Sequence, residues 1–265
     1  MLRNLFLKTW RDHWRGFLGW ALGLVAIVSV QLAVYPTVKQ SAADLEKYLK
    51  NFPPAFQAMF RMQDYSSGPG YISTELLSFM IPFIFISVGA GWGANATALE
   101  EERGTADFLL SLPISRSYIV LSKLSAALMA QVILAAVVAV AVIIGRRQVE
   151  LEASDIYILA SVLVCMLLGV LFLGLALFIG IATGKKTLAL GVTIAVALAS
   201  FLFYSLAPLV DTFDALLPVN PFQWTLGTDP MRKGFDVWHM LLTLAVSVAF
   251  YVASLIVYER RDLSA

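Results

Sequence analysis

Six long stretches without Asp, Glu, Lys or Arg constrain this chain more than any other feature of its sequence. A helix needs about 20 apolar residues to cross the hydrocarbon layer of a bilayer, because each residue adds about 1.5 Å. The stretches lack the two-residue alternation of barrel strands, and a helix satisfies its own backbone hydrogen bonds in lipid. The sequence therefore predicts an all-α membrane protein with transmembrane helices over residues 17–35, 76–99, 118–144, 156–182, 187–210 and 237–258.

The composition agrees with a membrane protein and excludes several other classes. Hydrophobic residues make up 59% of the chain and charged residues 14%, against about 25% charged residues in soluble domains. A net charge of +1 without a basic arm argues against nucleic acid as a partner. The single Cys165 excludes an internal disulfide and a cysteine-based metal cluster. We expect one transmembrane domain over residues 1–265 and no bound metal.

The segment that precedes the first apolar stretch, residues 2–16, has one apolar and one basic face. Its apolar side chains fall at helical spacing, and its cations lie mostly on the other face, which is typical of a helix in the headgroup plane. The apolar residues are Leu2, Leu5, Phe6, Trp10 and Trp14, and the cations are Arg3, Lys8, Arg11 and Arg15. We predict an interfacial amphipathic helix ahead of the first span.

The distribution of Lys and Arg around the spans predicts the orientation. The cations are denser on the side that holds the N-terminus, which places both chain ends in the cytoplasm and the protein in the bacterial inner membrane. Arg146 and Arg147 are the exception on the outer side, where Glu150, Glu152 and Asp155 can pair with them.

The motifs of catalysis and of ion-driven transport are missing from the sequence. The six stretches hold no carboxylate, Lys or Arg that could carry a proton or sodium ion, so energy for uphill transport would enter from another subunit. Residues 180–187 resemble a phosphate loop, but Lys186 occupies the position that needs Ser or Thr. Two glycine pairs, Gly180 with Gly184 and Gly19 with Gly23, have the spacing of helix-packing faces.

The segment between spans two and three, residues 100–116, carries the most information. Gly104 is expected to end one helix, and Thr105 to cap a short second helix that Pro113 stops. Ser115 or Ser117 can cap the next helix. The short helix would present Phe108, Leu109 and Leu112 beside a cluster of carboxylates, and such an exposed apolar surface suggests a docking site for another protein.

This segment resembles the permease subunit of type-2 ABC transporters, the bacterial ABC-2 membrane family. The resemblance rests on the runs 101–105 and 109–116, on Lys123 and on the run 70–75. It implies a short cytoplasmic coupling helix that contacts a separate ATP-binding cassette subunit, which itself binds ATP and Mg²⁺. The residues that it assigns to partner binding are Glu100, Glu101, Glu102, Arg103, Gly104, Thr105, Asp107, Phe108, Leu109, Leu112, Pro113 and Arg116. It also implies a dimer of permeases and transport in the direction of export.

Two alternatives from other classes stay open at this point. The chain could be a membrane enzyme or assembly factor for lipid or cell-envelope intermediates, or a sensor that signals through a partner. Scattered polar residues in the spans suggest an amphiphilic drug, peptide or lipid-like cargo, although ordinary interhelical hydrogen bonding would also explain them. These substrate-path candidates are Ser78, Ser87, Asn95, Thr193, Ser200 and Tyr204.

Overall fold

The computed structural model describes residues 5–41, 44, 51, 53, 65, 67–106, 111 and 113–261. Across these residues the chain is helical and contains no strand. The long helices are α1 (Leu5–Gln40), α5 (Met80–Asn95), α8 (Arg116–Gln148), α9 (Asp155–Thr183), α10 (Lys186–Leu206) and α13 (Val237–Arg260). With its preceding turns, α5 forms a 28-residue span, so the structure has six helices long and apolar enough to cross a bilayer. The predicted fold class is confirmed.

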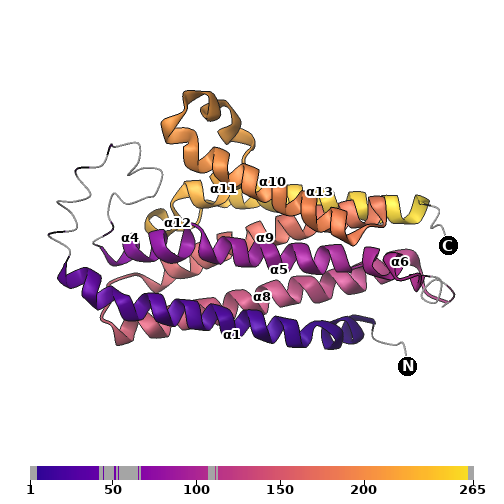
Figure 1. Cartoon of the computed structure of the whole chain (residues 1–265), viewed down its shortest axis with the longest axis horizontal. Coiled ribbons are helices and arrows are strands. Elements are labelled where there is room, and N and C mark those ends of the chain that lie inside the picture. The colour runs from indigo at the N-terminus through magenta and orange to yellow at the C-terminus, as the bar shows by residue number, and fades with distance from the viewer. Residues whose placement is uncertain are drawn as a thin grey trace.

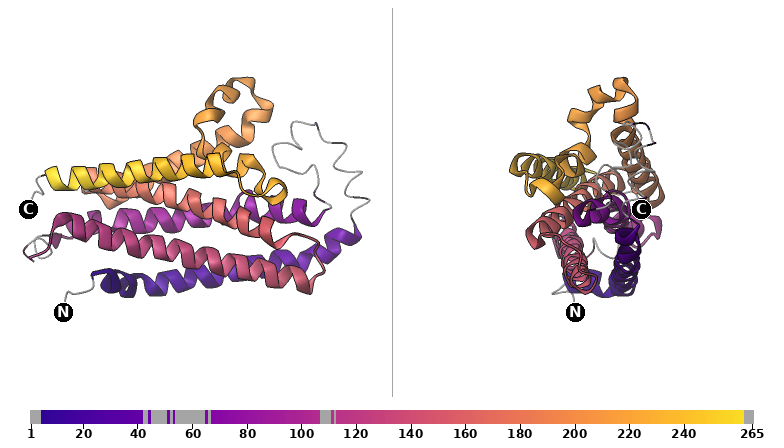
Figure 2. Two further views of the ribbon diagram at one scale, coloured as in Figure 1. Left: turned by 180° about the vertical axis from the view of Figure 1, so that it is seen from behind. Right: turned by 90° about the vertical axis from the view of Figure 1, so that its left-hand side faces the viewer.

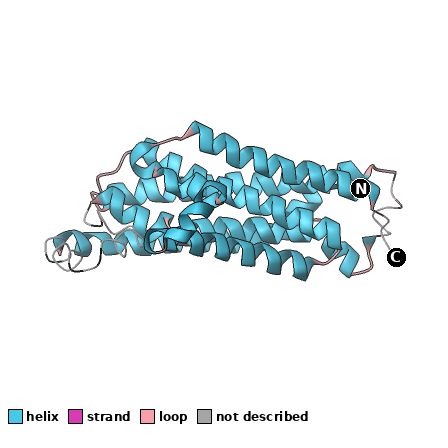
Figure 3. Cartoon of the chain, turned by 90° about the horizontal axis from the view of Figure 1, so that it is seen from above, coloured by secondary structure: helices cyan, strands magenta, loops and turns pink. Residues whose placement is uncertain are grey.

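The long helices run side by side in three layers (Figures 1 and 2). The α1–α8 pair forms one side, α10 and α13 form the other, and α5 and α9 lie between them. Figure 3 shows the same elongated bundle from above. The first turn of α1, the short helix α6 (Ala98–Glu102) and the last turn of α13 share one end of the bundle, which we call the terminal end.

The two central helices, α5 and α9, approach each other at backbone distance. A Cβ added to Gly89 would collide with the carbonyl oxygen of Gly169, and one added to Gly93 would lie 2.5 Å from that of Leu173. Gln131 of α8 joins this contact, because its Nε2 donates to the carbonyl oxygen of Phe85 at 3.0 Å. Small residues allow such contacts in membranes, where packing rather than water exclusion holds helices together.

The glycine pair Gly19 and Gly23, which the sequence suggested as a packing face, does not pack in this structure. A Cβ at either position meets no heavy atom of the chain within 4 Å. Gly180 of the other predicted pair lies near Ala94, Ala98 and Ala189, as expected for helix packing. Gly184 instead ends α9 with a φ of +68° and lies beside the side chains of Glu101 and Arg261, so the packing prediction holds for Gly180 alone.

The predicted interfacial helix is not separate from the first span. Residues from Leu5 to Gln40 form the single helix α1, so the described part of the predicted segment continues into the span without a break. At about 1.5 Å per residue, 36 residues exceed the length that crosses a bilayer. The helix α1 therefore extends beyond the hydrocarbon layer, either by a few residues at both ends or by several turns at one end. The sequence also suggests short helices at residues 44–50 and 55–62, and these residues lie largely outside the described part of the chain.

The second span is interrupted close to Pro82, a residue from which the sequence predicts a kink. The helix α4 (Gly68–Ile72) continues into a π-helical turn over Ser73–Leu77, and α5 restarts at Met80. Proline has no N–H to bond the carbonyl four residues earlier, and its ring clashes with that carbonyl, which is Ser78 here. The Ser78 hydroxyl donates to the Ser73 carbonyl oxygen at 2.7 Å. The break thus lies one turn before the proline.

The connection between α10 and α13 folds into short helices at the opposite end of the bundle (Figure 1). They are η3 (Ala207–Leu209), η4 (Asp211–Val219), α11 (Pro221–Thr225), η5 (Leu226–Thr228) and α12 (Pro230–Lys233). The side chain of Asn220 caps α11 and donates to the Ser200 carbonyl oxygen at 2.8 Å. The buried ring of Phe222 then packs against Phe83 and Phe201.

At the same end, Asp155 pairs with both Arg146 and Arg147, with 3.0 Å between the Arg147 Nη2 and the carboxylate. The pairing that we predicted for these two arginines is therefore confirmed for Asp155, one of the three carboxylates that we named. The carboxylate of Asp155 neutralises part of the positive charge of these two arginines, which are the exception to the predicted distribution of cations.

The α5–α9 contact predicts an asymmetry between neighbouring glycines. Gly89→Ala should lower the thermal stability of the purified protein by about 1–3 kcal/mol, because overpacking a tight contact costs that much. Gly91→Ala, on the same helix with open space at its Cβ, should leave the midpoint of unfolding unchanged. Equal midpoints for the two variants in detergent would contradict the contact.

Candidate functional site

The helix α6 ends at Glu102, and Gly104, which the sequence predicted to stop a helix, follows its C-cap Arg103. The φ of Gly104, +63°, is left-handed, and its N–H donates to the Glu101 carbonyl oxygen at 3.0 Å. The N–H of Thr105 reaches the Glu100 carbonyl oxygen at 2.9 Å. These two bonds satisfy carbonyls that a helix end leaves open, and glycine adopts the required φ without a steric penalty. The prediction for Gly104 is confirmed.

Lys123 fixes the start of α6 from the neighbouring helix α8. Its side chain is only 6% exposed and forms an ion pair with the Oε1 of Glu100. The same Nζ donates to the carbonyl oxygen of Ala96, in the short gap between α5 and α6. A cation stabilises the partial negative charge at the C-terminal end of a helix. Lys123 therefore stabilises the end of α5 and also neutralises the carboxylate of Glu100.

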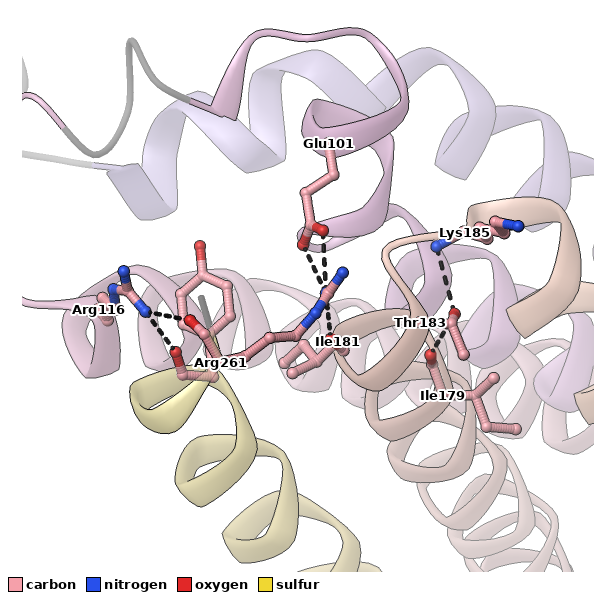
Figure 4. A network of polar contacts seen from close by, with 8 residues as sticks. Glu101, Arg116, Ile179, Ile181, Thr183, Lys185 and Arg261 are labelled. Atoms are coloured by element: carbon pink, nitrogen blue, oxygen red, sulfur yellow. Dashed lines mark hydrogen bonds and ion pairs between the residues drawn. The ribbon is translucent and has the colours of Figure 1, made fainter. Parts of the chain in front are cut away.

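Arg261, just after α13, joins α6 to the end of α9 (Figure 4). Its Nη1 lies 2.9 Å from the Oε2 of Glu101 and donates to the Ile181 carbonyl oxygen at 2.5 Å. Burial raises the pKa of the Glu101 carboxyl above its ordinary value, and Arg261 offsets only part of that shift. Gly184 makes room for this pair, because a Cβ there would collide with the Glu101 carboxylate.

Arg116, the first residue of α8, binds the end of α13. Its Nη1 donates to the carbonyl oxygens of Tyr258 at 3.1 Å and of Arg261 at 2.7 Å (Figure 4). The side chain of Ser115 caps the start of α8 by accepting from the Tyr118 N–H at 3.2 Å, as expected for one of the two predicted serines. The ends of α6, α8, α9 and α13 are therefore tied together.

We call Glu100, Glu101, Arg116, Lys123 and Arg261 the polar network. The family resemblance assigned all three carboxylates of residues 100–102 to an external partner, and that role stays a prediction. Glu100 and Glu101 pair with cations of their own chain. Glu102 is exposed and accepts from the Thr187 N–H at 3.3 Å. Ion pairs that are mostly removed from water are costly to separate, so these two carboxylates help to hold the helix ends together.

The remaining predicted partner-binding residues divide into two groups. Arg103, Gly104, Thr105 and Pro113 are exposed on the surface of the terminal end. Asp107, Phe108, Leu109 and Leu112 lie outside the described residues, so their role stays a prediction. Sequence reasoning missed Arg261 as a site residue and counted it only as a cytoplasmic cation. Its position directly after an apolar helix was the available signal, since cations favour such ends.

The six substrate-path candidates do not form one group. The hydroxyl of Ser87 donates to the Phe83 carbonyl oxygen of its own helix, like Ser78. Thr193 is fully buried, and Tyr204 packs against Phe222. Asn95 lines a cavity at the terminal end. The bonds of Ser78 and Ser87 stay within the second span and so do not join helices, and the path itself stays a prediction.

Within the described part of the chain, no group of three His, Cys, Asp or Glu side chains is placed to hold a metal ion. The ionised groups of the polar network bind each other and helix-end carbonyls at one end of the bundle. Six apolar helices tied in this way define a multi-pass helical membrane protein.

The comparison with protein families refines this class. The model of the family described as ABC-2 family transporter protein matches residues 3–263, so the chain belongs to that family. No curated protein matches the chain. Membership makes the chain a membrane component of an ABC transporter, in a family whose members associate with an ATP-binding subunit.

The pair of Glu101 and Arg261 predicts an asymmetric response to neutralisation. Arg261→Gln leaves a buried carboxylate without its cation and should cost about 1.5–3 kcal/mol of stability at neutral pH. Glu101→Gln should cost less, because it keeps an acceptor for Arg261 and removes a charge whose burial is unfavourable. Thermal unfolding in detergent measures both, with exposed Arg260→Gln as the control.

The same variants have a defined pH dependence. The pKa of Glu101 in the folded protein is raised, so ionising it costs folding free energy, and this cost is absent at pH values below its ordinary pKa of about 4.3. Removing Arg261 enlarges the cost. The gap in melting temperature between Arg261→Gln and the unchanged protein should therefore narrow as the pH falls from about 8 toward about 5. A gap that widens on acidification would refute the assignment.

Proposed function

We propose that this chain is the permease subunit of an ATP-driven exporter in a bacterial cytoplasmic membrane. The family match over residues 3–263 carries the proposal. The terminal end faces the cytoplasm in this proposal, in line with the excess of Lys and Arg around it. ATP and Mg²⁺ bind a separate cassette subunit, and this chain contributes no catalytic residue.

The cassette subunit docks, in this proposal, on the coupling segment of residues 105–113. Its flanks support this role. On one side Gly104 and α6 are fixed by Lys123, and on the other side Arg116 is bonded to the end of α13. A segment held at both ends transmits a displacement to the helices behind it instead of absorbing it. The exposed Thr105 and Pro113 at its two ends, and the exposed Arg103 beside it, supply polar and apolar surface.

Two permeases, identical or paralogous, form the pathway in this proposal, and the cargo is an amphiphilic drug, peptide or lipid-like molecule. The burial of the helices supports a second copy. In its most apolar window α9 is 72% buried, whereas α1, α10 and α13 are each 17% buried, and among these three we choose α10 on the family resemblance. The uncovered face of α10 includes Val192, Val196 and Phe203. Such a face is available for a two-fold contact within the bilayer.

The docking role is tested by Leu109→Glu, which lies outside the bilayer in our assignment. A charge placed in an apolar groove costs several kcal/mol, so the co-expressed cassette protein should no longer co-purify, or should hydrolyse ATP without transport. Leu109→Met is the matched control and should retain both activities. Full transport and full co-purification by Leu109→Glu would contradict the proposal.

The dimer is tested by single cysteines along α10 in a Cys165→Ser background. Cysteines at Val192, Val196 and Phe203 should cross-link two permeases, because these side chains are exposed on the protomer. Cysteines at Thr193 and Ala197, both fully buried within the protomer, should not. Equal cross-linking on both faces, or none on either in a functional complex, would exclude α10 as the contact.

A further inference from the structure

A groove of about 660 Å³ lies between α1 and α8, in the layer on the opposite side of the bundle from α10 and α13. Its volume is in the usual range for small-molecule sites, about 300–1,000 Å³. Val132, Val140 and Ile144 in its lining are 56%, 54% and 53% exposed, so the groove is open to its surroundings along its length. Its lining belongs to α1 and α8, and it therefore rests neither on the proposed docking segment nor on the α10 contact.

The side chains that line the groove cannot close it. The lining is mainly valine and isoleucine, with Ala136, Ala141 and Gly145 between them. A β-branched side chain has one strongly preferred rotamer in a helix, and alanine and glycine are too short to reach across. None of the described lining residues is Leu, Met or Phe, whose longer side chains could turn into the space. An open groove loses dispersion contacts unless another molecule fills it.

The groove occupies one half of the bilayer. Residues 124–145 of α8, between Lys123 and Arg146, measure about 33 Å at about 1.5 Å per residue, close to the hydrocarbon thickness of about 30 Å. The midpoint of this stretch lies between residues 134 and 135. The lining residues of α8 run from Val132 to Gln148. The groove therefore begins at the middle of the bilayer and ends at the headgroup level of the leaflet opposite the terminal end, which we call the far leaflet.

The α1 side of the groove lies at the same depth. A Cβ on Gly145 would collide with the side chain of Leu32, which puts these two residues at one level. Both helices run away from the terminal end (Figure 1), so Val25 and Ser29 lie about two turns and one turn nearer to the middle of the bilayer than Leu32. At the headgroup end the amide of Gln148 is exposed and can donate to an ester or phosphate oxygen.

Depth and length select a lipid chain over a helix of another protein. A transmembrane helix is continuous across both leaflets and about 10–12 Å wide, whereas this groove stops at the middle of the bilayer. An acyl chain of a phospholipid extends over one leaflet. The cations at the headgroup end give no preference between headgroups, because Arg146 and Arg147 are both paired with Asp155.

We propose that one acyl chain of a phospholipid of the far leaflet fills this groove, with its ester group beside Gln148. The chain takes the place of the long side chains that the α1–α8 contact lacks on this side. The site selects the length of the chain and not the headgroup, because its apolar lining extends over the whole leaflet while the two arginines at its end are already neutralised.

Native mass spectrometry of the purified full chain in detergent tests this selectivity. Dipalmitoyl lipids should be retained at least about tenfold more tightly than dioctanoyl lipids with the same headgroup, because each methylene buried in the groove lowers the Kd. Phosphatidylethanolamine and phosphatidylglycerol with equal chains should differ by less than about threefold. Equal retention of long and short chains, or a larger difference between the headgroups, would overturn the proposal.

Variants that fill the groove separate it from the rest of the apolar surface. Ala136→Leu and Ala141→Leu each place a longer side chain in the space and should weaken the retention of dipalmitoyl lipid at least about tenfold. Ala26→Leu is the matched control, because Ala26 is exposed on α1 beside Val25 but does not line the groove, and it should retain the lipid as the unchanged protein does.

Two results with these variants would contradict the proposal. The first is equal retention of lipid by Ala136→Leu, Ala141→Leu and Ala26→Leu. The second is loss of a permease dimer from the mass spectrum of Ala136→Leu with lipid retention unchanged, which would assign the groove to a second copy of this chain.

Discussion

The close approach of α5 and α9 is the constraint on which the other helix positions depend. In a bilayer the lipid tails are as apolar as leucine, so helices gain little from hydrophobic exclusion and associate through tight packing. Gly89 and Gly93 allow backbone contact between the central pair. The amide of Gln131 then sets the register of α8 by bonding the Phe85 carbonyl. Both outer layers pack against this central pair.

The terminal end follows from where the central helices stop. Because α5 ends at Asn95 and α6 begins at Ala98, the carbonyl of Ala96 needs a donor, and Lys123 provides it. The same need recurs at the ends of α9 and α13, whose carbonyls bind Arg261 and Arg116. Each helix end is thus capped by a cation from outside that helix, which joins the helices through their own unsatisfied groups.

The positions of the spans could be predicted because a single physical rule, exclusion of charge from hydrocarbon, sets them. Their ends could not, since a helix continues outside the bilayer without penalty, and α1 includes both Lys8 and Lys39. Gly89 and Gly93, which pack tightly, have the same four-residue spacing as Gly19 and Gly23, which do not. Spacing could not distinguish the two pairs, because the surface of the facing helix decides whether a glycine packs.

The candidate site shows the same division between local and distant information. Gly104 was predictable because a left-handed helix end is a local property of the backbone. The pairs of Glu100 with Lys123 and of Glu101 with Arg261 join residues 23 and 160 positions apart. A run of three glutamates indicates a charged surface, but only the folded arrangement shows which of them face their own chain.

One carboxylate joins α6 to α8 at the terminal end. Glu100 binds Lys123 through Oε1, and the same Lys123 also binds the Ala96 carbonyl between α5 and α6. Lys123 is 6% exposed, so separating it from Glu100 would leave a buried charge without its partner, which is costly. In the proposed function, a displacement of the coupling segment that moves α6 is therefore passed to α8 and to the end of α5 through this one ion pair.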